Sequence, residues 1–190
     1  MNICVYAASG RELDNIYFEE AYRLGELISR AGHTLVFGGG NEGLMGACAR
    51  GAKATGGKII GIAPRFFDEP GVLYADCDEF IYTETMRQRK QLMEQTADAF
   101  IMLPGGIGTF EEFFEILTLK QLGRHSKPIA ILNTAGYYEP MIHMLCHTAK
   151  HRFMNEKCLE LYLLCDCPAQ AVEHCTSTEK LSGSIRRFNV

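Results

Sequence analysis

The sequence predicts a Rossmann-like α/β fold, in which a doubly wound, mainly parallel sheet of about seven strands carries helices on both faces. Short apolar, β-rich runs alternate with segments of helical pattern along most of the 190 residues. Most of the strand runs are continuously apolar, which is typical of strands buried on both faces of a parallel sheet. The alternation of strands and helices in turn implies right-handed βαβ units.

The expected elements follow one another without a linker or an internal repeat. The candidate strands, each a short apolar run, are ICVYA (3–7), TLVFG (34–38), KIIGIA (58–63), EFIY (79–82), AFIML (99–103), PIAIL (128–132) and LYLLC (161–165). The segments with a helical pattern lie near 14–31, 43–55, 84–97, 109–122, 137–150 and 168–175. We therefore expect one domain over 1–176 and a polar C-terminal tail over 177–190.

The composition is that of an ordinary globular protein, and it argues against several classes of function. A net charge of −4 offers no basic surface for nucleic acid. No apolar run reaches the ~18 residues of a membrane span, and the chain opens directly on a strand, so we expect a cytoplasmic protein without a membrane partner. The eight cysteines include no CxxC pair, which favours reduced, mostly buried thiols.

The segment PGGIGT follows the fifth expected strand and leads into a helix that we expect to begin at Thr109. Glycine lets the backbone approach a ligand closely, and the start of a helix adds free N–H groups and a partial positive charge. Gly105, Gly106 and Gly108, with the Thr109 hydroxyl, could therefore cradle a phosphate. A tight turn from strand to helix without a ligand is the alternative.

The segment GGGNEG (38–43) formally matches the GxGxxG pattern of dinucleotide-binding proteins. That pattern expects an acidic residue at the end of the next strand, about 20 residues further on. The next strand ends instead in Ala63-Pro64. An NAD-dependent oxidoreductase is therefore a distant alternative, and the absence of GK[ST] after either glycine loop argues against a P-loop.

Arg89 stands on the apolar face of the helix expected over 84–97. On a helical wheel it lies between Leu92 and Met93, on the face that also carries Met86. A cation on an inward face is costly unless it meets an anion. Arg89 could extend its charge to solvent, form an ordinary buried ion pair, or meet an anionic substrate in the cleft.

Glu112 occupies a similar position on the helix expected over 109–122, between Ile116 and Leu119. Thr109 and Glu112 also match a capping box, in which Glu112 would only bond back to the Thr109 backbone. Three glycines and an inward arginine nearby favour Glu112 as a carboxylate of the site. Glu111 points elsewhere on the helix, and we expect a solvated charge there.

A histidine-rich stripe runs along the helix expected over 137–150. The four residues of this stripe are His143, Cys146, His147 and His151. Their spacing could hold a metal, but no nearby carboxylate completes the set. We therefore expect a surface stripe and no metal site.

These motifs together resemble those of the LOG family, the cytokinin riboside 5′-monophosphate phosphoribohydrolases. The family signature PGGxGTxxE matches 104–112, and the family's Met-His-x-Arg-Lys helix matches Met86, Arg89 and Lys90. The glycine segment YGGGxxGLMG matches 37–46, and the pattern QLGxHxKPI…N…GYY matches within 121–138. The resemblance covers about residues 2–165. Arg87 replaces the family's histidine, and AASG replaces its first loop.

The resemblance implies hydrolysis of the N-glycosidic bond of adenosine or N6-substituted adenosine 5′-monophosphates, giving a free base and ribose 5-phosphate. It implies that Arg89 and Glu112 are the catalytic pair and that the 105–109 loop holds the phosphate. The other residues expected at the substrate are Ser9, Gly39, Gly40, Met86, Lys90 and Glu111. It further implies that no cofactor or metal is needed and that the protein is a homodimer.

Two other functions remain as alternatives besides the distant NAD-dependent oxidoreductase. The first is a general AMP or purine nucleotide nucleosidase, and the second is a non-catalytic carrier of a nucleotide or molybdopterin cofactor. A carrier does not need both Arg89 and Glu112, so the presence of this pair argues against the carrier. Lysine decarboxylation, an older description of the family, is rejected because nothing marks a lysine that would anchor pyridoxal phosphate.

Overall fold

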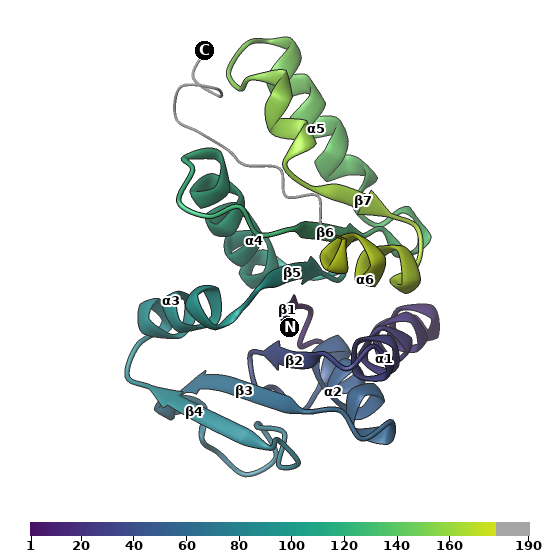
Figure 1. The fold of residues 1–190 in the computed structure, drawn as a ribbon, viewed down its shortest axis with the longest axis vertical. Helices are drawn as coiled ribbons and strands as arrows, with labels where there is room; N and C mark the ends of the chain where they lie inside the picture. Colours follow the sequence, from purple (N-terminus) through teal and green to yellow (C-terminus); the bar gives the residue numbers. More distant parts are fainter. Residues whose placement is uncertain (178–190) are drawn as a thin grey trace.

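A computed structural model describes residues 1–177 and contains one seven-stranded parallel sheet (Figure 1). The strands are β1 (Asn2–Tyr6), β2 (Thr34–Phe37), β3 (Ile59–Pro64), β4 (Glu79–Thr83), β5 (Ala99–Met102), β6 (Ile129–Leu132) and β7 (Leu163–Cys165). All six strand pairings are parallel. The predicted fold class and each of the seven strands are confirmed.

Each predicted helix is also present. The helices are α1 (Asn15–Arg30), α2 (Gly43–Ala54), α3 (Met86–Thr96), α4 (Ile107–Gln121), α5 (Glu139–Lys150) and α6 (Pro168–Thr176). Three short 3₁₀ turns add to them: η1 (Arg65–Phe67), η2 (Thr134–Gly136) and η3 (Glu156–Glu160). No helix among the described residues is both long and apolar enough to cross a membrane.

The helices cover the sheet in two layers (Figure 1). On one face, side chains of α1, α2 and α6 pack against alternate sheet residues such as Ile3 and Val5. On the other face, α3, α4 and α5 pack against the residues between them, such as Cys4 and Tyr6. Because both faces are covered, every residue of β2, β3, β5 and β6 except Thr34 is buried, as the continuously apolar runs predict.

The strand order β4-β3-β2-β1-β5-β6-β7 reverses direction between β1 and β5. The chain moves outward from β1 to β4 and then returns to β5, from which it moves outward again to β7. In an open parallel sheet, ligands bind at the carboxyl ends of the strands beside such a reversal. The loops after β1, β2 and β5 therefore lie where a ligand site is expected.

Two local predictions are wrong. The fourth helix begins at Ile107 rather than Thr109, because the extended Gly106 caps it and Thr109 already lies within its first turn. Met86 does not face inward, since it is the first residue of α3 and is 38% exposed. The inward face of α3 consists of Met93, with Arg89 and Leu92 on either side of it. The expected C-terminal tail lies outside the described residues from 178 onward.

Candidate active site

Three loops predicted to bear the site meet around the backbone of Ala8. The Ala8 N–H donates to the Pro104 carbonyl at 3.1 Å, which joins the loop after β1 to the PGGIGT loop after β5. The Ala8 carbonyl accepts from the Leu44 N–H at 2.9 Å, which joins the same loop to the start of α2. The carboxyl ends of β1, β2 and β5 therefore share one rigid junction.

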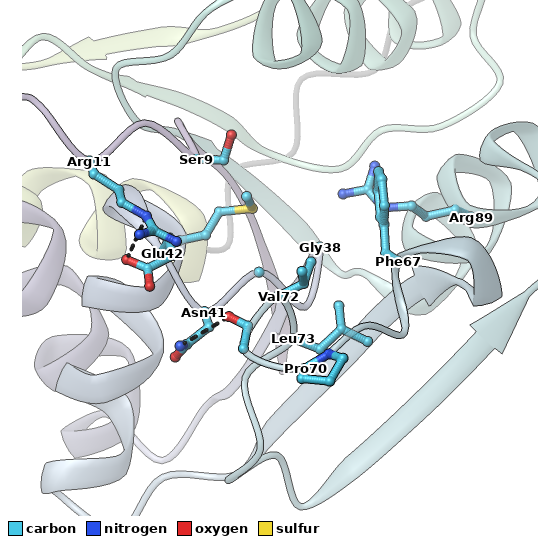
Figure 2. Close-up of a pocket in the computed structure, with 13 residues that line it drawn as sticks. Ser9, Arg11, Gly38, Asn41, Glu42, Phe67, Pro70, Val72, Leu73 and Arg89 are labelled. Carbon is cyan, nitrogen blue, oxygen red and sulfur yellow. Dashed lines mark hydrogen bonds and ion pairs between the residues drawn. The ribbon is translucent and has the colours of Figure 1, made fainter.

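A cavity of about 520 Å³ opens beside this junction (Figure 2). It is lined by Ser9, Arg11, Gly38, Gly40, Asn41, Glu42, Met45, Phe67, Pro70, Gly71, Val72, Leu73 and Arg89. Three of the predicted substrate-binding or catalytic residues, Ser9, Gly40 and Arg89, contribute to its wall. The volume lies in the range of pockets that enclose a small molecule such as a nucleotide.

One wall of the cavity, formed by Phe67 and the segment 70–73, was not predicted. A β-bridge between Gly40 and Leu73 attaches this segment to the glycine loop after β2. Hydrogen bonds from Asn41 N–H to the Val72 carbonyl and from Tyr74 N–H to the Gly39 carbonyl, 2.9 and 2.8 Å long, reinforce the bridge. These residues follow β3 in an irregular segment, and no periodic pattern in the sequence marked them as part of the site.

Arg89 is buried on α3, and its guanidinium reaches the cavity (Figure 2). Its Nε donates to the Ile62 carbonyl at 3.2 Å, and its Nη1 donates to Glu112 Oε1 at 2.6 Å. A Cβ at position 38 would lie 2.0 Å from Nη2, so only glycine leaves room for this arrangement. Gly38 is thus a site residue that the sequence interpretation did not single out.

Glu112 projects from the second turn of α4, and its side chain is 11% exposed. Burial raises the pKa of Glu112 above its ordinary value, and the neighbouring Arg89 guanidinium opposes that rise. The carboxylate accepts from Arg89 and is not among the residues that line the cavity. Glu112 is therefore joined to the cavity wall through its contact with Arg89.

Lys90 and Glu111 pair with each other outside the cavity. The Lys90 ammonium contacts Glu111, and it lies 2.9 Å from Glu115 Oε2. Burial acts to lower the pKa of Lys90, but the two carboxylates outweigh it and the pKa is raised. Glu111 is half exposed, as expected of a solvated charge, and it also belongs to a surface ion-pair cluster with Lys90.

The start of α4 combines one tight glycine with two open ones. A Cβ on Gly105 would lie 2.1 Å from Thr109 Oγ1, whereas Gly106 and Gly108 face open space. No side chain caps this helix among the described residues, so its first N–H groups are free to meet an anion. The capping-box alternative for Thr109 and Glu112 is wrong.

A capping box is present at the preceding helix instead. The Thr85 hydroxyl accepts from the Gln88 N–H at 3.2 Å, and the Gln88 side chain accepts from the Thr85 N–H at 3.1 Å. This box fixes the first turn of α3 and with it the direction of Arg89.

Other predicted residues lie away from the cavity. Gly39 has a φ of +76° and supports the turn after β2 without lining the cavity. Met86 is exposed at the start of α3. The side chains of His143, Cys146, His147 and His151 lie on the exposed side of α5, and residues 1–177 contain no cluster of three or more metal-ligating side chains.

The fold and the site together define a doubly wound α/β protein with a ligand cavity beside the reversal of strand order and a buried arginine–glutamate pair at its edge. The family described as "possible lysine decarboxylase" matches residues 45–175. A cytokinin riboside 5′-monophosphate phosphoribohydrolase of Rhodococcoides fascians is 39% identical over 150 residues, which span 78% of this chain and 76% of the relative. The enzyme of that name from Mycobacterium tuberculosis is 35% identical over 91% of this chain and 92% of its own.

The chain therefore belongs to the LOG family, whose members carry the name cytokinin riboside 5′-monophosphate phosphoribohydrolase. Solved structures of the same fold include a molybdenum cofactor binding protein of Rippkaea orientalis, with a TM-score of 0.68 and 24% identity over 90% of this chain and 93% of that one. The molybdenum cofactor carrier protein of Chlamydomonas reinhardtii gives a TM-score of 0.68 at 23% identity, with the same coverage. These two likenesses concern the fold alone.

Proposed function

We propose that this protein hydrolyses the N-glycosidic bond of N6-substituted adenosine 5′-monophosphates, releasing the free base and ribose 5-phosphate. The main observation behind the proposal is the buried Arg89–Glu112 pair. The arginine of this pair also lines a cavity large enough for a nucleotide. The names of the relatives supply the reaction. The pair lies in the two sequence segments that resemble the motifs of the family.

Glu112 supplies the negative charge that this reaction needs. Cleavage of the bond between the ribose and the base passes through an oxocarbenium-like state, as in the hydrolysis of other glycosides. A carboxylate close to C1′ stabilises that cation and orients or deprotonates the attacking water. The burial that raises the pKa of Glu112 also makes it a better proton acceptor than an exposed glutamate.

Arg89 links the carboxylate to the substrate. It is buried and holds Glu112 through Nη1 and the Ile62 carbonyl through Nε, so its position is set before a ligand enters. Its guanidinium also forms part of the cavity wall, where it can bind the nucleotide or assist the departing base. Preorganised charges of this kind act without reorganisation during the reaction.

The start of α4 is the proposed phosphate site. Gly106 and Gly108 leave open space there, and the free N–H groups of the first turn favour an anion through both hydrogen bonding and the helix dipole. Ser9 lines the cavity, and its neighbour Ala8 donates a hydrogen bond to the Pro104 carbonyl, which joins the cavity wall to the loop before α4.

The apolar part of the cavity favours a substituted adenine over plain AMP. Phe67, Pro70, Val72 and Leu73 form a wall of mostly apolar atoms, with Met45 also contributing to the cavity. An isoprenoid chain on N6 would bury apolar surface against this wall, whereas the amino group of AMP would not. A general AMP nucleosidase is the alternative that this wall argues against.

The proposal is tested by incubating the protein with isopentenyladenosine monophosphate and with AMP, and by following free base and ribose 5-phosphate chromatographically. We expect equal amounts of both products, formed faster from the substituted nucleotide. Equal rates would favour the general nucleosidase. Tight nucleotide binding with no release of base would favour a carrier.

We further propose that the protein is a homodimer that associates through the α3–α4 face. A groove of about 390 Å³ lies there, lined by side chains of both helices that include Arg87 and Lys90. Ile107 at the start of α4 is 89% exposed, and Met86 at the start of α3 is also exposed, so burial against a second copy would remove apolar surface from water. Light scattering should give twice the mass of one chain, and Ile107→Asp should shift it toward the monomer.

A further inference from the structure

Two adjacent tyrosines, which the proposed reaction does not otherwise use, donate hydrogen bonds to backbone carbonyls in and beside the PGGIGT loop. The Tyr137 hydroxyl donates to the Gly105 carbonyl at 2.8 Å, and the Tyr138 hydroxyl donates to the Leu103 carbonyl at 2.7 Å. The Pro104 carbonyl between them accepts from the Ala8 N–H. Three successive carbonyls of the loop therefore have separate donors, each from a distant part of the chain.

The turn that carries the tyrosines is itself rigid and strained. Asn133 follows β6, and its Oδ1 accepts from the Tyr138 N–H at 2.7 Å. Ala135 adopts a φ of +52°, a conformation that few residues other than glycine take, and Gly136 has a φ of +73°. Backbone strain of this kind persists only where the surrounding contacts determine it, and it concentrates near functional sites.

The hydrogen bonds to these carbonyls also set the direction of the N–H groups of the loop. In a trans peptide the C=O and the following N–H point in opposite directions. Because the Gly105 carbonyl points to Tyr137, the Gly106 N–H points away from it. Among residues 1–177, the amides of Gly105 and Gly106 donate no hydrogen bond, so they remain available beside the free N–H groups of α4.

We infer that Tyr137 and Tyr138 are positioning residues, which orient the peptide groups of 104–106 so that the loop amides and the start of α4 converge on an anion such as the 5′-phosphate of the substrate. The phosphate assignment rests on the proposed function, whereas the anion site itself does not. Tyr138 is fully buried and packs edge to face with Phe110 on α4, so it also stabilises the fold. Tyr137 is 40% exposed, which makes its hydroxyl the cleaner test.

The test is Tyr137→Phe, which removes one hydroxyl and keeps the ring. Loss of one neutral hydrogen bond predicts a rise of about two- to tenfold in KM for the nucleotide, with kcat changed less than about twofold. The dissociation constant for ribose 5-phosphate, measured by calorimetry, should rise by the same factor, whereas that for adenosine, which has no phosphate, should not change. Tyr22→Phe is the matched control, since Tyr22 is 38% exposed on α1 and its hydroxyl has no partner among the described residues.

The outcomes separate this inference from the proposed reaction. If the wild type releases no base but binds ribose 5-phosphate, and Tyr137→Phe weakens that binding, the reaction is wrong and the anion site stands. If Tyr137→Phe leaves both KM and the dissociation constant unchanged, or weakens adenosine equally, the inference is wrong. Failure of the wild type to bind ribose 5-phosphate would also overturn it. A melting temperature close to that of the wild type shows that the variant is folded.

Discussion

Arg89 and Glu112 lie 23 residues apart in the sequence and form a buried ion pair 2.6 Å long between α3 and α4. The two helices follow β4 and β5, which are not neighbours in the sheet, so only the complete fold brings the charges together. Removing two charges from water is costly, and apolar residues of similar size usually serve stability as well or better. The pair is therefore better explained by a role in the site than by a role in stability.

This explanation predicts the stabilities of a double-mutant cycle. Arg89→Met leaves a buried carboxylate unpaired and should lower the free energy of unfolding by about 3–5 kcal/mol. Arg89→Met with Glu112→Leu should be more stable than Arg89→Met alone, because no charge then remains buried. Urea unfolding of the four proteins measures this. As a control, Arg30→Met removes an exposed pair with Glu26 and should cost no more than about 1 kcal/mol. A double variant less stable than both single ones would contradict the explanation.

Gly38→Ala should disable the site without removing either charge. The new Cβ would lie 2.0 Å from Arg89 Nη2 and must displace the guanidinium from Glu112. We expect base release to fall by about 100-fold, since a displacement near 1 Å in an active site can cost that much. Gly10→Ala is the control, because a Cβ at that position meets nothing within 4 Å. Equal activities of the two variants would show that the position of the guanidinium is unimportant.

The raised pKa of Glu112 predicts how its contribution to stability changes with pH. Because the pKa is higher in the folded than in the unfolded protein, the contribution is fully present below the unfolded value and is lost as the pH rises through the folded value. Glu112→Gln stays neutral throughout. The variant should therefore gain stability relative to the wild type as the pH rises above 4.5, the ordinary pKa of a glutamate, measured by urea unfolding. A relative loss over the same range would mean that Arg89 outweighs burial.

Phe67→Ala tests the apolar wall. Phe67 lines the cavity, whereas its neighbour Phe66 is more exposed and does not. Removing the ring should lower the ratio of kcat/KM for isopentenyladenosine monophosphate to that for AMP by about tenfold, through lost apolar contact. Phe66→Ala should leave the ratio unchanged. If both substitutions change the ratio equally, the wall does not select the substituent.

The order and type of the elements could be predicted because each strand is a short apolar run and each helix has a periodic face. Element ends were less predictable where backbone geometry decides them. Gly106 precedes α4 in an extended conformation, a feature that no side-chain pattern predicts. Met86 faces solvent because α3 begins with it, although the helical wheel places it on the apolar face.

Arg89 and Glu112 could be predicted as site residues, because a charge on an apolar helix face requires a partner of opposite charge. That they are each other's partner required the fold. The wall from Phe67 to Leu73 could not be predicted, because an irregular loop held by one β-bridge has no periodicity. Gly38 was missed because its role depends on the position of a side chain far along the chain.

The most direct test of the account compares the wild type with Glu112→Gln at saturating isopentenyladenosine monophosphate. Glutamine keeps the size and a hydrogen-bond acceptor for Arg89 but cannot carry negative charge. We predict that base release falls by about 10²–10⁴-fold while nucleotide binding changes little. Glu173→Gln, an exposed substitution on α6, should be as active as the wild type. Base release by Glu112→Gln at the wild-type rate would contradict the assignment of Glu112 as the catalytic carboxylate.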